Sequence, residues 1–108
     1  MNRGELWTVA GGVYASKPRP ALIIQDNRYE ATDSVTVLPL TTADVDAPLL
    51  RLPVPVTGAT GLERPSFIMI DKLTTVRRSS VVTHLGRLSS SQMVDVERAL
   101  LVFLGLAD

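Results

Sequence analysis

The chain has 108 residues with eleven basic and eleven acidic side chains, so any nucleic-acid contact must be a local groove rather than a whole basic face. Its 45% hydrophobic content favours a single folded domain over residues 1–108, and no apolar run reaches the roughly eighteen residues that a membrane span needs. The lack of cysteine excludes disulfides, thiolate nucleophiles and cysteine-based metal sites, and the lack of a secretory signal at the N-terminus indicates a cytoplasmic protein.

Apolar patterns predict three strands in the first half of the chain. Residues 5–10 form the first predicted strand. Residues 21–24 are continuously apolar, which is typical of a central strand buried on both faces. Residues 34–37 alternate with the period of a half-buried strand. We expect the strand residues Trp7 and Phe67 to fill the core.

The second half carries three more strand signals. In residues 50–56, Pro53 and Pro55 fall on the same phase, so their missing N–H groups point the same way and predict an edge strand. Residues 66–71 form a second predicted buried strand, which ends on charge. Residues 81–85 are a further predicted strand.

A C-terminal helix is the clearest single element. Ser89 and Gln92 have the spacing of a capping box. Apolar side chains follow at helical intervals up to a glycine stop, namely Met93, Val96, Leu100, Phe103, Leu104 and Gly105. This helix face belongs to the core or to a subunit interface. The predicted fold is therefore mainly β (α+β), a small, strongly bent antiparallel sheet or barrel with the helix packed against it.

Arg19 is the first candidate for function. It stands between Pro18 and Pro20, and each proline ring fixes φ and restricts the preceding residue, so the mount is stiff. The planar guanidinium stays charged and suits a phosphate or the extra charge of a phosphoryl transition state. The alternative is a surface arginine that pairs with a carboxylate such as Asp26.

Thr41 and Thr42 are the second candidates, because they follow a predicted strand and Pro39. A hydroxyl there could donate to a phosphate oxygen or orient a ribose hydroxyl. Threonine at a strand end is also ordinary turn chemistry, and that alternative stays open.

Weaker candidates for substrate binding lie in two other places. Asp71 and Lys72 end a predicted strand, where they could position a nucleotide or simply form an ion pair. Tyr14, Ser16 and Lys17 lie in a predicted loop over residues 13–18, from which Tyr14 could stack on a base.

Two further polar features are assigned to structure rather than chemistry. The single histidine, His84, is interpreted as structural or peripheral, and no metal site is predicted around it. Arg77 and Arg78 are interpreted as a solvated cationic turn, with phosphate contact as the alternative.

Taken together, five segments resemble the MazF/PemK (Kid) family of toxin endoribonucleases. Each motif is loose alone, but the five occur in the family's order over nearly the whole chain. They are RGELW at 3–7, RPALII at 19–24, VLPLTT at 37–42, SFIMIDKL at 66–73 and LGRLS at 85–89.

The resemblance implies a small SH3-like, CcdB-type barrel with a C-terminal helix, usually in a homodimer. It implies cutting of single-stranded RNA without a metal or other cofactor, and restraint by a cognate antitoxin with an acidic, flexible tail. By position, Arg19 matches the family's catalytic arginine, Thr41 the threonine that works with it, and Asp71 an acidic site residue of one branch. That branch has an arginine where this chain has Met69, and residues 10–18 lack the histidine that some members carry.

The chemistry implied is transesterification, in which the RNA's own 2′-hydroxyl attacks the adjacent phosphorus. The protein then needs mainly to position the strand and to stabilise developing charge. Two alternatives remain, a CcdB-like topoisomerase inhibitor that does not act as an enzyme and a catalytically silent paralogue. The tail at residues 105–108 lacks the Trp-Gly ending of CcdB, which disfavours the inhibitor.

Overall fold

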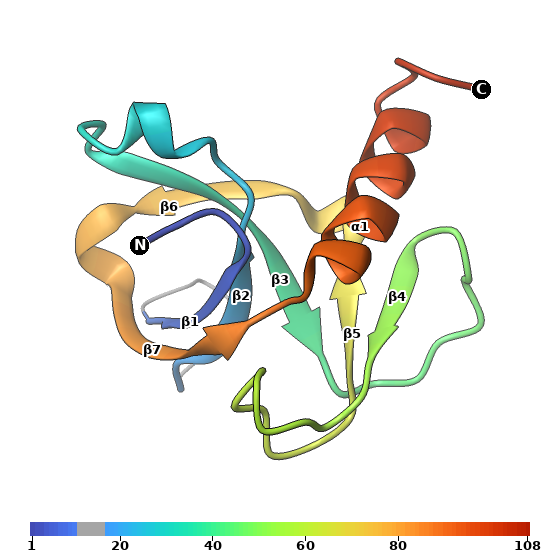
Figure 1. The fold of residues 1–108 in the computed structure, drawn as a ribbon, viewed down its shortest axis with the longest axis horizontal. Helices are drawn as coiled ribbons and strands as arrows, with labels where there is room; N and C mark the ends of the chain where they lie inside the picture. Colours follow the sequence, from blue (N-terminus) through green and yellow to red (C-terminus); the bar gives the residue numbers. More distant parts are fainter. Residues whose placement is uncertain (11–16) are drawn as a thin grey trace.

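The computed structural model describes residues 1–10 and 17–108 (Figure 1). Its strands form one antiparallel sheet in the order β4–β5–β3–β2–β1–β7. Strand β6 pairs with the first part of β3, on the same edge that pairs with β5 further along. Within the described residues the strands are β1 (Glu5–Val9), β2 (Arg19–Ile23), β3 (Ser34–Thr41), β4 (Arg51–Val54), β5 (Ser66–Met69), β6 (Thr74–Arg77) and β7 (Val81–Arg87). Short 3-10 helices occupy Asn27–Tyr29 (η1), Ile70–Lys72 (η2) and Arg78–Ser80 (η3), and the α-helix α1 is Ser90–Phe103.

The sheet bends around β3, its longest central strand. One edge of β3 pairs with β2, while the other edge pairs first with β6 and then with β5. This change of partner turns the sheet, as the ribbon shows (Figure 1). No pairing among the described residues joins the outer strands β4 and β7, so the predicted antiparallel fold with a C-terminal helix is confirmed in an open form.

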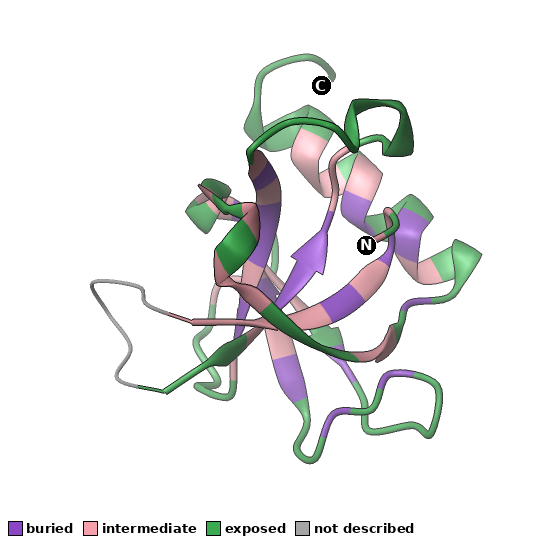
Figure 2. Cartoon of the chain, turned by 90° about the vertical axis from the view of Figure 1, so that its left-hand side faces the viewer, coloured by how far each residue is buried: buried purple, intermediate pink, exposed green. Residues whose placement is uncertain are grey.

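Side-chain alternation gives the sheet two hydrophobic faces, and α1 covers one of them (Figure 2). The larger cluster comprises Leu6, Leu22, Leu38, Leu40, Val54, Leu62, Ile68, Ile70, Leu88, Met93 and Val96. The smaller cluster comprises Ala21, Ile23, Val35 and Val37, with Trp7 packed at its border. Trp7 and Phe67 are only half-buried, so the expectation that they fill the core is wrong.

Several strand predictions are confirmed and several need correction. The edge strand is confirmed, since β4 lies at one end of the strand order. The strand predicted over 66–71 is wrong beyond Met69, because the backbone enters a 3-10 turn at Ile70, although the Ile70 N–H still donates to the Leu50 carbonyl in the register of β4 and β5. Strand β7 continues past the predicted end to Arg87. Strand β6 was not predicted, because its sequence TTVR has no alternating apolar pattern. Only Val76 of its residues is half-buried, and the others are exposed.

Helix α1 begins at the predicted capping box. The Gln92 N–H donates to Ser89 Oγ at 3.1 Å, and the Ser89 N–H donates to Gln92 Oε1 at 2.8 Å. The chain leaves the helix through Gly105, whose φ of +74° favours glycine. No helix in the described part of the chain is long and apolar enough to cross a membrane.

Candidate functional site

The two principal candidates, Arg19 and Thr41, lie at the same end of neighbouring strands. Across β2 and β3, Ala21 stands opposite Pro39 and Leu22 opposite Leu38. Two residues further along this register come Arg19, the first residue of β2, and Thr41, the last of β3. Antiparallel pairing therefore brings together residues that are 22 positions apart in the sequence.

The Arg19 side chain is exposed at this rim of the sheet. Its backbone is fixed by pairing with Val9 of β1, so the guanidinium projects from an ordered strand end. None of the ion pairs formed within residues 1–10 and 17–108 involves Arg19. The alternative partner Asp26 binds Arg28 instead, with Oδ1 3.2 Å from Nε. The cation at the rim is therefore open to an anionic ligand from solvent.

Thr41 is half-buried, and its side chain bonds to the backbone of the turn that follows β3, as the alternative of ordinary turn chemistry predicts. Its Oγ1 accepts a hydrogen bond of 3.1 Å from the Ala43 N–H. A hydroxyl that accepts one bond still has its own proton to donate, so this turn orients the group without using its donor. Thr42, the next residue, is exposed beside it.

The flanks of this rim come from neighbouring elements. Phe67 of β5 stands opposite Thr41, and Pro53 of β4 stands opposite Phe67, which gives the rim an apolar side. Lys17 is exposed two residues before Arg19. The predicted contacts Tyr14 and Ser16 lie outside the described residues.

Asp71 and Lys72 lie at the opposite end of the β4–β5 pair. They belong to η2, four and five residues beyond Phe67 and past the end of β5. The structure therefore places these two residues at the other end of β5 from Phe67 and Thr41, not at the rim. Within one copy of the chain they form a separate polar cluster.

Sequence reasoning missed the partner of Asp71, which is Arg51. Arg51 of β4 stands opposite Met69 of β5, and its Nη1 donates to Asp71 Oδ1 and, at 3.0 Å, to the Leu50 carbonyl. Only 13% of the Arg51 side chain and 24% of that of Asp71 are exposed. The available signal was an arginine inside the otherwise apolar run Leu50–Leu52.

His84 is peripheral, as predicted. Its ring lies 5.1 Å from that of Trp7, and its Nε2 lies 3.5 Å from Glu5 Oε2. Partial burial would raise the pKa of the Glu5 carboxyl, but hydrogen bonds from the Asn2 N–H and Trp7 Nε1, together with nearby His84, hold that pKa below its ordinary value. In the described ranges, no three His, Cys, Asp or Glu side chains lie close enough to hold a metal ion.

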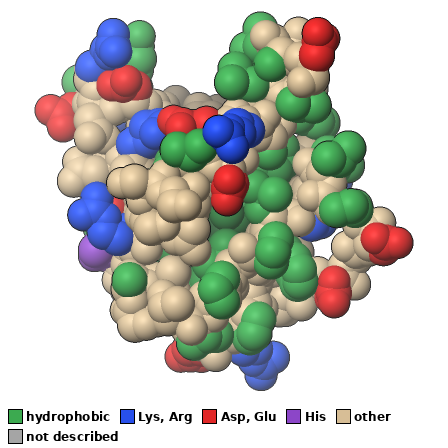
Figure 3. All heavy atoms as spheres, turned by 45° about the vertical axis from the view of Figure 1, so that its right-hand side comes forward, with side chains coloured by type: hydrophobic (Ala, Val, Ile, Leu, Met, Phe, Trp, Pro, Cys, Tyr) green, Lys and Arg blue, Asp and Glu red, His purple; other side chains and the backbone are tan. Residues whose placement is uncertain are grey.

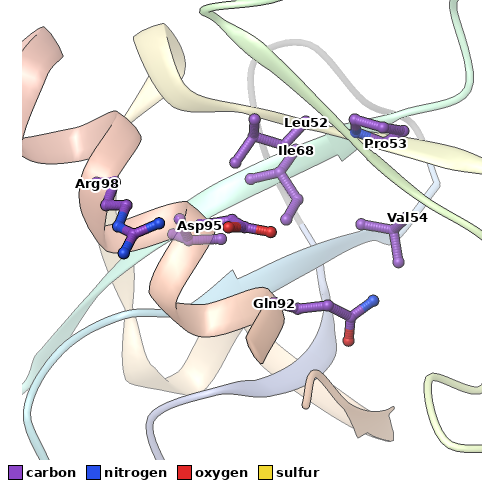
Figure 4. A pocket seen from close by; sticks show the side chains of 8 residues that line it. Leu52, Pro53, Val54, Ile68, Gln92, Asp95 and Arg98 are labelled. Atoms are coloured by element: carbon purple, nitrogen blue, oxygen red, sulfur yellow. The ribbon is translucent and has the colours of Figure 1, made fainter. Parts of the chain in front are cut away.

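An apolar groove between β4 and α1 lies apart from these polar groups (Figure 4). Side chains of the helix stand over a floor made by the strands, and none of the predicted site residues that the structure describes lines it. The lining residues are Leu52, Pro53, Val54, Ile68, Gln92, Asp95, Val96 and Arg98. Hydrophobic side chains also gather over the exposed end of α1, at the upper right of Figure 3.

Comparison with known sequences agrees with this fold and these motifs. Residues 2–104 match the family model described as the PemK-like, MazF-like toxin of type II toxin–antitoxin systems. A probable endoribonuclease MazF of Mycolicibacterium smegmatis is 58% identical over 108 residues, which cover 99% of each chain.

Solved structures support the same architecture. The Mycobacterium tuberculosis toxin MazF-mt6 has a TM-score of 0.81 and 24% identity, over 98% of this chain and all of that one. A mycobacterial endoribonuclease in complex with its cognate antitoxin has a TM-score of 0.80 and 23% identity, over all of this chain and 98% of that one. At these identities the likeness concerns the fold.

Proposed function

The chain belongs to the PemK-like, MazF-like family of toxins from type II toxin–antitoxin systems, and from this premise we propose that it cuts single-stranded RNA with Arg19 and Thr41. As a member with a 58% identical MazF relative, it is an endoribonuclease. The choice of Arg19 and Thr41 as the catalytic pair is supported by their position at one rim of the sheet, on adjacent ends of β2 and β3.

The proposed reaction uses a nucleophile from the substrate. The ribose 2′-oxygen forms a bond to the adjacent phosphorus while the bond from phosphorus to the 5′-oxygen breaks. The 2′-hydroxyl loses its proton and the leaving 5′-oxygen gains one, which gives a 2′,3′-cyclic phosphate and a 5′-hydroxyl. A dependence on the 2′-hydroxyl also lets the enzyme distinguish RNA from DNA.

The two rim residues have different roles in this proposal. A guanidinium is a poor proton acceptor, so Arg19 stabilises the negative charge that develops on the phosphoryl oxygens and does not act as a base. The Thr41 hydroxyl, oriented by the Ala43 N–H, donates to a phosphate oxygen. The stiff prolines around Arg19 favour this role, because electrostatic stabilisation depends on preorganised groups.

Other predicted contacts extend the binding surface. Lys17 and Thr42 flank the rim and meet neighbouring phosphates or bases. Tyr14 and Ser16 lie outside the described residues and remain predicted contacts. Asp71 and Lys72 are proposed to meet the RNA at some distance from the scissile bond, since they lie at the other end of β5.

We also propose the partners that the family implies, a second copy of the chain and a cognate antitoxin with an acidic tail. The mycobacterial endoribonuclease structure above was solved in complex with its cognate antitoxin. The exposed hydrophobic end of α1 supports pairing of two copies through this face. It comprises Leu101, Val102, Phe103, Leu104 and Leu106, each at least 43% exposed. A cytoplasmic location, where mRNA is translated, is part of the same proposal.

The test is incubation of purified protein with a long single-stranded RNA in EDTA, followed by mapping of the ends. We expect discrete fragments with 5′-hydroxyl ends from the parent and no fragments from Arg19→Ala, with Arg28→Ala as the matched exposed control. A parent that leaves RNA intact but blocks DNA supercoiling would indicate the CcdB-like alternative, which the family match disfavours. Cleavage by Arg19→Ala at the parent rate would refute the role of Arg19.

A further inference from the structure

Phe67 is a large aromatic side chain that the packing of the sheet leaves only half-buried. It is the second residue of β5, and its neighbours Ser66 and Ile68 are both buried. Since side chains alternate along a strand, the Phe67 ring lies on the other face. There it belongs to neither hydrophobic cluster formed by residues 1–10 and 17–108. Core packing among these residues therefore does not account for the position of the ring.

The strand register places Phe67 in a row with the two proposed catalytic residues. Phe67 stands directly opposite Thr41, and Thr41 lies at the rim beside Arg19. Side chains of directly opposite residues share one face of the sheet, with Cβ atoms about 4.5–5.5 Å apart. Arg19, Thr41 and Phe67 therefore follow one another across β2, β3 and β5, on the face away from the larger hydrophobic cluster.

The surroundings of the ring are apolar and lie near the edge of the sheet. Pro53 stands opposite Phe67 on β4 and is exposed, and Met69, two residues along β5 on the same face, is half-buried. Strand β4 is the last strand at this end of the sheet, so no further strand of the described residues lies beyond Pro53. An apolar surface beside a cation and a hydroxyl matches the two parts of a nucleotide, because the phosphate takes polar contacts and the base takes an aromatic face.

We propose that the Phe67 ring stacks on the base of a nucleotide that flanks the scissile phosphate. Because β3 and β5 are only about 4.8 Å apart, a phosphate bound at Thr41 has the base of its own or the adjoining nucleotide within reach of the ring. The inference rests on the proposed RNA cleavage at Arg19 and Thr41, and it adds the contact that holds a base beside them. Every base has a π-face, so Phe67 contributes to the affinity for RNA and not to the choice of sequence.

The test measures binding of a short single-stranded RNA that contains the mapped cut site, with a 2′-deoxynucleotide at the attacking position so that it stays intact. In a series of such RNAs, each nucleotide near the cut lacks its base in turn. We expect the parent to lose about tenfold in affinity when one base that flanks the cut is missing. Phe67→Leu should lose about tenfold with the complete RNA and nothing more with that abasic RNA, because the same contact is already gone.

Two further variants separate stacking from folding and from a general loss of aromatic surface. Phe67→Tyr keeps the ring, so it should bind the complete RNA within about threefold of the parent and keep the sensitivity to the missing base. Tyr29→Leu is the matched control, since Tyr29 is a 54% exposed aromatic side chain in η1, outside the row. It should leave the Kd of every RNA unchanged. Thermal unfolding of each variant shows the fraction folded, to which the binding data are corrected.

The outcomes decide between a base contact, a structural side chain and a protein contact. A parent that binds every abasic RNA as tightly as the complete one, or equal losses with the abasic RNA in the parent and Phe67→Leu, would overturn the proposal. If Phe67→Leu binds RNA normally but sedimentation shows an altered assembly, the ring belongs to a contact between copies and the proposal is wrong. A parent that cuts RNA and gives either result refutes this inference alone, whereas a parent that never cuts RNA refutes the proposed function as well.

Discussion

Arg3 Nη2 lies 2.8 Å from Glu97 Oε2, an ion pair that ties the start of the chain to helix α1. The same guanidinium donates through Nε to the Ile24 carbonyl at 3.1 Å, just after the end of β2. One side chain therefore joins three elements that are distant in the sequence. It holds α1 against the side of the sheet that contains the larger hydrophobic cluster.

Replacement of Arg3 by methionine should lower the free energy of unfolding by about 1–2 kcal/mol. The partly exposed ion pair contributes at most about 1 kcal/mol, and the hydrogen bond to Ile24 contributes a similar amount. Urea unfolding measures the change, and Glu97→Gln should give roughly half of it. Arg28→Met, which removes a solvent-exposed pair, should change stability by less than about 0.5 kcal/mol. Equal effects of Arg3→Met and Arg28→Met would contradict the tie to α1.

Local sequence signals predicted the elements that depend on local physics. The capping box at Ser89 and Gln92 needs only four consecutive residues, and its two hydrogen bonds are present. The edge position of β4 followed from the phase of Pro53 and Pro55, because a missing N–H excludes pairing wherever the strand lies. Signals of this kind do not depend on what the rest of the chain does.

Features that depend on distant partners were missed. Strand β6 is largely exposed and is held by its pairing with β3, so no apolar pattern marks it. Asp71 lies in the 3-10 helix η2, directly after the last pair of β4 and β5, so its position depends on where that pairing ends. The pairing of Arg51 with Asp71 follows from the register of β4 and β5, which single-sequence patterns do not give. Local signals made Arg19 and Thr41 candidates, the resemblance gave them catalytic roles, and those roles stay predictions.

Gly86, within β7, should be intolerant of any side chain. A Cβ built there would lie 2.2 Å from the Ala59 carbonyl oxygen and 2.5 Å from the Thr60 carbonyl carbon, both backbone atoms that cannot swing away. We expect Gly86→Ala to lower the free energy of unfolding by about 2 kcal/mol or more. Gly58→Ala is the matched control, because nothing lies within 4 Å of its Cβ position. The urea midpoint of Gly86→Ala should be clearly lower than that of Gly58→Ala. Similar midpoints would show that the backbone at residues 59–60 moves to make room for the added Cβ.

The Glu5 carboxylate should make stability depend on acid pH. Since its pKa is lower in the folded chain than the ordinary 4.5, its contribution is fully present above that value and is lost as pH falls through the folded pKa. The difference in unfolding free energy between the parent and Glu5→Gln should therefore be constant from pH 7 to about 5 and shrink below about 4. Chemical unfolding at a series of pH values measures it. A Glu5→Gln difference that is independent of pH would rule out the shift.

Thr41 offers a test of whether its hydroxyl acts on the substrate or only on the turn. Thr41→Ser keeps the Oγ that accepts from the Ala43 N–H and keeps the donor proton, so RNA cleavage should stay within about threefold of the parent. Thr41→Val keeps the shape and removes both functions, and loss of one preorganised donor to a developing oxyanion reduces kcat by about 100- to 1,000-fold.

If the hydroxyl served only the turn, removal of its backbone partner should have the same effect as removal of the hydroxyl. Ala43→Pro removes the same N–H donor and keeps the hydroxyl, so a structural role would make its kcat and unfolding free energy fall with those of Thr41→Val. If Thr41→Val loses kcat at unchanged stability while Ala43→Pro retains most of it, the hydroxyl acts on RNA; parallel losses in both variants would assign Thr41 to the turn.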